Sequence, residues 1–189
     1  AGNFATASHV LLALIVLIGG PLQFISKIRT KFPKFHRFNG RLYVFTGFIL
    51  AIGGVALLWV FDGGAGSISM QIGTTVNAVL ILIFGFLTVK YAIARKIQIH
   101  SQYALRLFMV MNGVWFFRVG LMFWIFVNGG PAGFDPKTFE GPALTILSYA
   151  QFLVPLAFLE VYFRVKQQKV VWQRVAFSAS VIVCTLCMA

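Results

Sequence analysis

The sequence predicts an all-α fold, a polytopic transmembrane helical bundle of about six spans that forms one membrane domain over residues 1–189. Three observations support this prediction. Hydrophobic residues make up 59% of the 189 residues, and the mean hydropathy is +0.88. Charged residues make up only 11%, whereas a soluble domain carries about 25%. Fourteen of the sixteen Lys and Arg residues fall in three clusters that alternate with long apolar runs: residues 27–41, 90–106 and 164–174.

Six apolar runs supply the spans, because about 20 residues are needed to cross about 30 Å of hydrocarbon. The first run, residues 4–25, contains the sequence Gly-Gly-Pro near its end, so we expect its last turns to be kinked or broken. The basic and aromatic segment 26–40 should lie along the cytoplasmic interface as a partly helical stretch. The other runs are residues 41–61, 74–94, 102–127, 143–165 and 174–189. The Gly-rich segment 62–73 predicts a flexible loop.

The distribution of basic residues sets the predicted orientation. The connection near Asp62 and the connection near Asp135 together hold one basic residue, Lys137. The basic clusters are therefore expected to face the cytoplasm and residue 1 to lie outside, because cytoplasmic loops carry the excess of Lys and Arg. Trp59 and Trp124 then lie near the outer interface, as aromatic belts require. This pattern predicts a multi-pass membrane protein whose basic clusters lie on the cytoplasmic side.

The net charge of +12 does not indicate a nucleic-acid partner. The charges lie at the ends of apolar runs, where they contact anionic headgroups, so membrane lipids are the predicted partners. The sequence has no P-loop, no dinucleotide-binding Gly-rich turn, no HExxH and no Gly-x-Ser-x-Gly. Hydrolysis by paired carboxylates is implausible with four acidic residues. Cys184 and Cys187 lie in the last apolar run and are expected to be structural apolar residues.

Two histidines at the predicted inner side share a similar neighbourhood. His36 and His100 are each followed, about one and a half helical turns later, by an Arg that enters the membrane. Two imidazoles at equal depth on neighbouring helices can bind a haem b axially, and nearby Arg and Tyr side chains can bind its propionates. Alternatively, interfacial His and Arg bind lipid phosphates and cap helices. The candidate cofactor-binding residues here are His36, Arg41, Tyr43, His100, Tyr103 and Arg106.

Ionisable groups at membrane depth are further candidates, because they are costly there unless they are paired. Arg118 lies in the outer third of the fourth run, where it would anchor a propionate, a quinone carbonyl or a lipid phosphate, or extend to the outer interface. His9 lies on the same side, so His9 and Arg118 would form a second cofactor-binding pocket. Glu160 is expected to form a structural ion pair with Arg106, or with Arg164 one turn away. The sequence leaves the presence of a metal unknown.

Three segments together resemble one protein family. They are His9 with the Gly-Gly-Pro-Leu-Gln-Phe sequence that follows it, His36-Arg-x-x-Gly-Arg-x-Tyr43, and His100-x-x-Tyr-Ala-Leu-Arg106, with Arg118 further on. This pattern is similar to bacterial polytopic membrane proteins of the domain of unknown function 2306 (DUF2306) family, over about residues 8–160. The family usually has two Arg residues directly after the second inner His, where this chain has Ser and Gln. The resemblance implies a polytopic helical bundle with His and Arg in functional positions, and no particular reaction.

The sequence supports two principal hypotheses. The first is a membrane redox module that binds haem b or quinone through His36 and His100, or through His9 and Arg118. The second is a non-catalytic accessory or assembly subunit of a larger membrane complex, which binds lipids and partner helices. A small-solute or lipid transporter is a third hypothesis, although the paucity of buried acids argues against ion coupling. The ligand, the partner proteins, the oligomeric state and whether the chain is an enzyme stay open at this stage.

Overall fold

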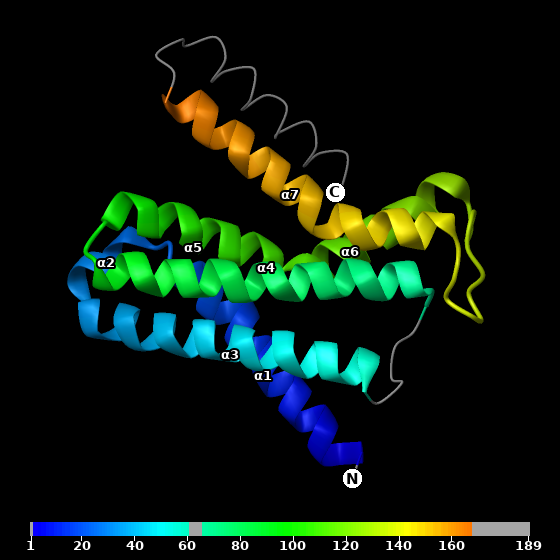
Figure 1. The fold of residues 1–189 in the computed structure, drawn as a ribbon, viewed down its shortest axis with the longest axis horizontal. Helices are drawn as coiled ribbons and strands as arrows, with labels where there is room; N and C mark the ends of the chain where they lie inside the picture. Colours follow the sequence, from blue (N-terminus) through cyan, green and yellow to red (C-terminus); the bar gives the residue numbers. More distant parts are fainter. Residues whose placement is uncertain (1, 61–65, 168–189) are drawn as a thin grey trace. The chain divides into compact units, whose positions relative to one another are not determined.

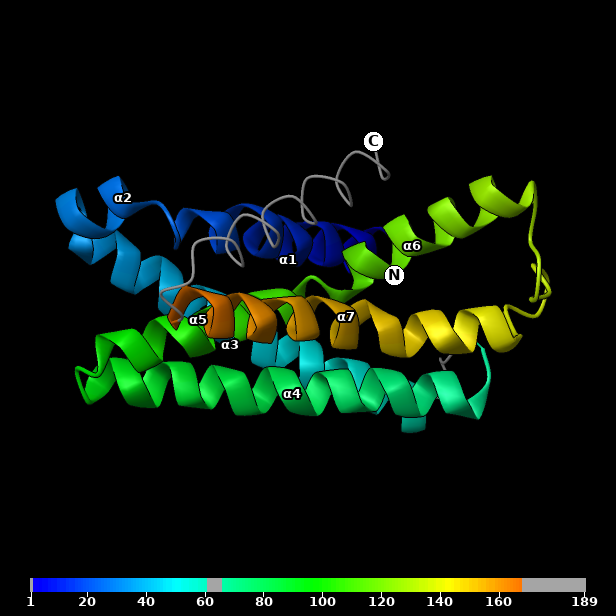
Figure 2. The same cartoon turned by 90° about the horizontal axis from the view of Figure 1, so that it is seen from above.

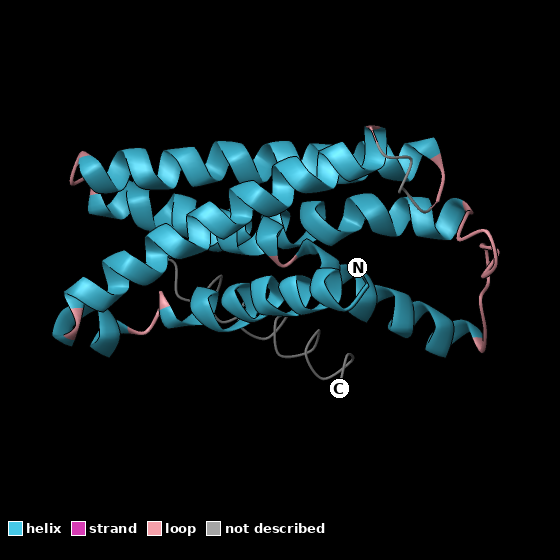
Figure 3. Ribbon diagram, turned by 90° about the horizontal axis from the view of Figure 1, so that it is seen from below, coloured by secondary structure: helices cyan, strands magenta, loops and turns pink. Residues whose placement is uncertain are grey.

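The computed structural model describes residues 2–60 and 66–167, and the helices of this part are drawn in Figure 1. They are α1 (Gly2–Leu22), α2 (Ser26–Lys31), α3 (Pro33–Trp59), α4 (Ile68–Ile93), α5 (Ile97–Met111), α6 (Gly113–Asn128) and α7 (Pro142–Gln167). Figure 3 shows only helices and connecting loops among these residues. The predicted all-α fold is therefore confirmed.

Several of the described helices suit a membrane. The helices α3 and α4, and residues Pro142–Lys166 of α7, are each long and apolar enough to cross one. The helices α5 and α6 qualify together as a fourth, broken crossing. Helix α1, with 21 residues, occupies the first predicted run, whereas the predicted span 174–189 lies outside the described residues. The number of six spans therefore stays approximate, and the orientation stays a prediction.

Two helices begin earlier than the apolar runs suggest. Helix α3 begins at Pro33, which suits a first helical turn because its φ is preorganised and its missing N–H needs no partner there. Helix α4 begins at Ile68, inside the segment 62–73 that the sequence predicts as a flexible loop. Gly73, at the end of this segment, allows close helix packing and does not form a loop, since a Cβ there would lie 3.1 Å from the Ser148 hydroxyl. The loop prediction is therefore wrong from Ile68 onward.

The fourth predicted span, residues 102–127, is not one continuous helix. Helix α5 ends at Met111 and α6 begins at Gly113. Asn112 lies at the break and caps α5, because its side-chain Nδ2 and its backbone N–H both donate to the Phe108 carbonyl, at 2.8 Å and 3.2 Å. The glycine that follows adds backbone freedom at the same point. The predicted run 102–127 is therefore interrupted at Asn112, and its two helices together still qualify as one broken crossing.

The chain divides into two compact units. Unit 1 comprises residues 1–64 and 74–112, and unit 2 comprises residues 65–73 and 113–189. Unit 1 therefore holds α1, α2, α3, most of α4 and α5. Figures 1 and 2 show α2, the start of α3, the end of α4 and the start of α5 at the same end of unit 1. This end, called the basic end below, carries the Lys and Arg residues of segments 27–41 and 90–106.

Helices α1 and α2 both pack against α3. The core of unit 1 lies where α3 meets α4 and α5. Gly47 of α3 lies so close to its neighbours that a Cβ there would contact Ile81 of α4 and Met111 of α5. Asn77 of α4 donates to the carbonyl of Val110, which is 1% exposed, at 3.2 Å. These contacts hold α3, α4 and α5 in register and thereby position the basic end.

Unit 2 is built on α6 packed against α7. Phe152 of α7 is 1% exposed, and Tyr149 donates to the carbonyl of Ser69 at 3.0 Å, which ties α7 to the first turn of α4. The indole of Trp124 donates to the carbonyl of Ala132 at 2.7 Å. The connection between α6 and α7 is thus anchored by a side chain that the sequence predicts at the outer interface.

Candidate functional site

Helix α1 approaches α3 closely at the basic end of unit 1. A Cβ on Gly20 would lie 3.0 Å from the Tyr43 ring and 2.9 Å from the Phe108 ring, so a larger residue does not fit here. Phe24 packs edge-to-face on Phe108 with ring centroids 5.2 Å apart. Helix α1 ends at Leu22, directly after the Gly-Gly-Pro sequence. The glycines of this sequence therefore allow close helix contact.

A hydrogen-bonded network joins α1 to α3. The Asn39 amide nitrogen donates to the Gly19 carbonyl at 2.8 Å. We assign the Gln23 amide from its partners, with its oxygen toward the backbone N–H of Gly40, at 3.1 Å, and toward the Asn39 amide nitrogen. The Gln23 nitrogen then donates to Nδ1 of His36 at 2.9 Å. Because a carbonyl can only accept and a backbone N–H can only donate, the two ends of this network set the direction of each bond.

The same network assigns the proton on the His36 ring. Nδ1 of His36 accepts the Gln23 N–H, so the neutral ring carries its proton on Nε2. The free side of the His36 ring therefore presents an N–H donor.

His100 has the opposite arrangement. Its Nδ1 lies 2.9 Å from the backbone carbonyl of Thr88. A carbonyl only accepts, so Nδ1 carries the proton of the neutral ring and Nε2 keeps its lone pair. The Thr88 residue is buried, and its hydroxyl donates to the Phe84 carbonyl at 2.6 Å. An Nδ1–H bond to a backbone carbonyl is also the arrangement that orients histidine ligands in metal sites.

His36, near the start of α3, and His100, near the start of α5, lie at the same end of unit 1 (Figures 1 and 2). Both residues are half-buried. The charge of His100 when its ring is protonated, and the charges of Arg29 and Arg37, act on the His36 ring. The described part of unit 1 contains no Asp or Glu that would offset them. One imidazole thus offers a donor and the other an acceptor at the basic end, in a strongly positive environment.

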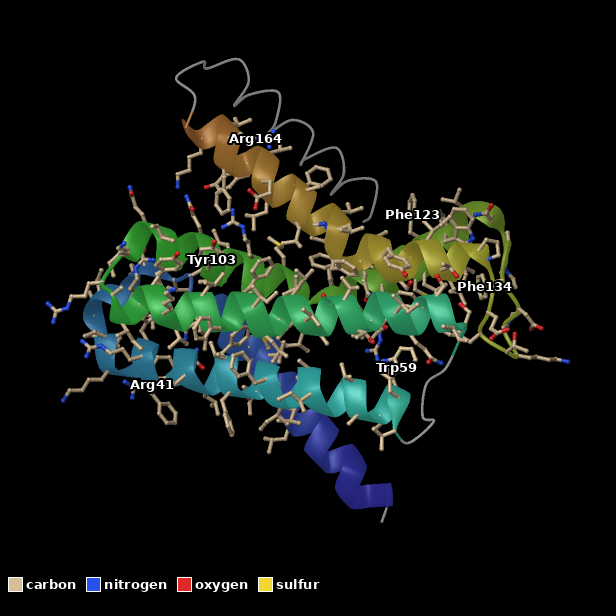
Figure 4. All side chains as sticks on the ribbon, viewed as in Figure 1. Arg41, Trp59, Tyr103, Phe123, Phe134 and Arg164 are labelled. Atoms are coloured by element: carbon tan, nitrogen blue, oxygen red, sulfur yellow. The ribbon has the colours of Figure 1, made fainter. Side chains whose placement is uncertain are left out.

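Tyr103 and Arg106 form an aromatic and cationic cluster on α5. Tyr103 stacks on Tyr91 with ring centroids 5.4 Å apart. The Arg106 guanidinium lies over the Tyr103 ring, 5.1 Å from its centroid, which is a cation–π contact. Figure 4 labels Tyr103 on α5 and Arg41 on α3. Arg41 is exposed, so it lies on the surface of the basic end rather than in its interior.

Tyr43 adds a buried polar group below His36. Seven residues make about two helical turns, so Tyr43 and His36 share one face of α3. Tyr43 is 4% exposed, and its hydroxyl has no hydrogen-bond partner within the described residues. A buried hydroxyl without a partner is costly and calls for an explanation, of which a bound ligand or water is the simplest.

Residues 6–163 match the family model described as "Predicted membrane protein (DUF2306)". The chain belongs to the DUF2306 family. The resemblance that the His and Arg motifs indicate is therefore confirmed, and the protein is an integral membrane protein with several apolar helices. No curated protein and no solved structure matches it.

The other predicted site residues of this DUF2306 protein lie apart from the histidine pair or outside the described side chains. His9 belongs to α1, and its side chain is among those that the structure does not describe. Arg118 is exposed on α6 in unit 2, so the pocket of His9 with Arg118 stays a prediction. Glu160 belongs to unit 2 and Arg106 to unit 1, so their ion pair stays a prediction as well.

The described residues offer few candidate metal ligands. No group of three His, Cys, Asp or Glu residues is placed to hold a metal ion within residues 2–60 and 66–167. Cys184 and Cys187 lie outside the described residues.

Sequence reasoning missed Gln23, Asn39 and Thr88. The first two are the amide residues inside the motifs that carry the DUF2306 resemblance, Gly-Pro-Leu-Gln-Phe and His-Arg-Phe-Asn-Gly-Arg. A polar amide at the end of an apolar run needs a partner, and this requirement is the signal that could have indicated both. Thr88 offers no such signal, because its backbone carbonyl rather than its side chain orients His100.

Proposed function

We propose that this DUF2306 protein is a membrane redox module that binds a quinone between His36 and His100. One observation carries the proposal. The two imidazoles offer opposite hydrogen-bonding groups, an Nε2–H on His36 and an Nε2 lone pair on His100. A quinone carbonyl needs a donor and a quinol hydroxyl needs an acceptor, so this pair suits both states of the ligand.

Tyr43 supports the same class of ligand. Its hydroxyl is buried without a partner among the described residues, and it lies on the face of α3 that also carries His36. A ligand carbonyl that accepts this O–H would remove the cost of an unpaired buried hydroxyl, which is about 1–3 kcal/mol. The Tyr43 hydroxyl is thus the third polar group that we assign to the quinone head.

Haem b is the alternative ligand of this site. Axial ligation needs a lone pair on Nε2 of each histidine, because iron binds the unprotonated nitrogen of a neutral imidazole. His100 meets this requirement, and Arg106 and Tyr103 are suitable partners for propionates. His36 would have to move its proton to Nδ1, and the Gln23 amide would then have to turn and lose the bond from Gly40. These costs favour quinone over haem b.

A quinone titration of the purified protein in nanodiscs tests the proposal. We expect saturable binding of a short-chain quinone and no Soret band in the absorption spectrum. His36→Ala and His100→Ala should each weaken quinone binding by about three- to tenfold, as expected for one hydrogen bond. Gln98→Ala serves as the control, because Gln98 is an exposed polar residue at the start of α5.

Each contrary result points to a different function. A Soret band that both histidine substitutions abolish would replace quinone by haem b. Absence of both the Soret band and quinone binding in a folded preparation would reject the redox module.

An accessory or assembly role in a larger membrane complex is the second candidate, and an exposed face of α3 favours it. Ile52 is 60% exposed, and a Cβ on Gly53 or Gly54 would meet nothing within 4 Å. Small residues let membrane helices approach closely, so this face suits a partner helix as well as lipid. Co-purification of the same subunits with wild type and with a His36→Ala/His100→Ala double variant would support this role. Isolation of the chain alone from its native membrane would reject it.

A bacterial inner-membrane location, with the basic end in the cytoplasm, belongs to the same proposal. The family and the apolar helices support a membrane location. The clustering of Lys and Arg supports the orientation, because cytoplasmic segments carry the excess of basic residues.

A further inference from the structure

Unit 1 has a strongly one-sided charge. Its described part contains ten Lys and Arg residues and no Asp or Glu. All ten lie in segments 27–41 and 90–106, which meet at the basic end in Figures 1 and 2. Like charges gathered in this way repel one another, and an anion bound among them lowers the free energy of the folded state.

Two exposed arginines lie on either side of the junction between α2 and α3. Helix α2 packs against α3, so Arg29 of α2 and Arg37 of α3 lie at the same end of unit 1. Two guanidinium groups form a donor set of the kind that binds phosphate oxygens.

Exposed aromatic rings alternate with the basic residues of the same segment. Phe32, Phe35 and Phe38 are 62%, 45% and 67% exposed. A segment that exposes basic and aromatic side chains together binds at the lipid headgroup level, where the rings enter the acyl boundary and the cations contact phosphates. A soluble anion would neutralise the arginines but leave these rings in water.

We propose that Arg29 and Arg37 bind the phosphate of an anionic phospholipid, with the neighbouring Phe rings inserted beside its acyl chains. This lipid site goes beyond the quinone function and does not depend on it, because neither arginine is assigned to the quinone. The lipid supplies the negative charge that the described part of unit 1 lacks. Its binding therefore selects anionic over zwitterionic headgroups.

Lipid selectivity of the purified full chain tests this site, with native mass spectrometry as the readout. The wild-type protein should bind short-chain phosphatidylglycerol about 25-fold more tightly than phosphatidylcholine, because each of the two arginines contributes about 1 kcal/mol. The Arg29→Gln/Arg37→Gln double variant should lose about fivefold of this preference for each charge removed. Lys137→Gln is the matched control, because it removes one exposed positive charge from unit 2, and it should keep the full preference.

A charge-conserving pair, Arg29→Lys/Arg37→Lys, covers the case in which the glutamine pair does not fold. It should retain most of the preference, since lysine still contacts phosphate as a point charge. Equal affinity of wild type for the two lipids, or an unchanged preference in the glutamine pair, would overturn the proposal. Inorganic phosphate that displaces phosphatidylglycerol at equal concentration would also overturn it, in favour of a soluble anion.

The quinone and the lipid proposals are separable by one further variant. His100→Ala should weaken quinone binding and leave the phosphatidylglycerol preference intact. Loss of both properties in His100→Ala would overturn the separate lipid site.

Discussion

The side-chain amide of Gln23 lies between Nδ1 of His36, at 2.9 Å, and the backbone N–H of Gly40, at 3.1 Å. One amide therefore ties the turn after α1 to the first two turns of α3. The same amide places the proton of the neutral His36 ring on Nε2. Gln23 thus determines both the contact between α1 and α3 and the hydrogen-bonding group that His36 offers to a ligand.

Replacement of Gln23 by leucine removes this bridge while it keeps a similar volume. We expect Gln23→Leu to lower the free energy of unfolding by about 1–3 kcal/mol, because the Asn39 amide and the His36 ring lose a buried partner. Denaturant titration of the protein in detergent micelles measures the change. Gln98→Leu is the control, because Gln98 is exposed and its substitution should change little. Equal unfolding free energies of the two variants would contradict the bridge.

The contact of α1 with the rest of unit 1 should depend on Gly20. A Cβ there would lie 2.9 Å from the Phe108 ring, so Gly20→Ala forces the ring or the helix to move. We expect a loss of about 1–3 kcal/mol of stability, which is typical of overpacking. Gly53→Ala is the matched control, since its Cβ would meet nothing within 4 Å. The control should be neutral or stabilising by up to about 1 kcal/mol, because alanine favours the helix.

The two histidines should differ in tautomer. At about pH 8.5, well above the usual imidazole pKa of about 6.5, nitrogen-15 spectra should show the proton of His36 on Nε2 and the proton of His100 on Nδ1. Assignment follows from the loss of one signal pair in His36→Ala and of the other in His100→Ala. In Gln23→Leu the His36 signals should move toward an average of the two tautomers, whereas the His100 signals should stay in place. A His36 ring with its proton on Nδ1 in the wild type would favour haem b ligation instead.

The orientation of the chain is testable by labelling of single cysteines. In a Cys184→Ser/Cys187→Ser background, we expect a membrane-impermeant maleimide to label Lys137→Cys in intact cells. Lys31→Cys in α2 should react only after the cells are permeabilised, because the basic end is predicted to face the cytoplasm. Labelling of Lys31→Cys in intact cells would show that the predicted orientation is wrong.

Helix positions were largely predictable from composition. The last described helix, Pro142–Gln167, agrees closely with the predicted run 143–165. A long apolar segment between charged ends must satisfy its backbone groups internally in lipid, so it forms a helix. The break at Asn112 escaped prediction because the run around it is apolar on both sides. Asn112 caps α5 through a side-chain bond to the Phe108 carbonyl, and no change in composition marks that position.

The sequence by itself determined that the chain is an all-helical membrane protein with its basic residues gathered at helix ends. These properties follow from local composition. Apolar helices are stable in lipid, whereas charged side chains stay in water or among the headgroups. Only the tertiary structure decided that Gln23 holds His36 and that the Thr88 carbonyl orients His100. Such bonds join residues on different helices, and their direction depends on which backbone donor or acceptor lies at each end, which composition does not encode.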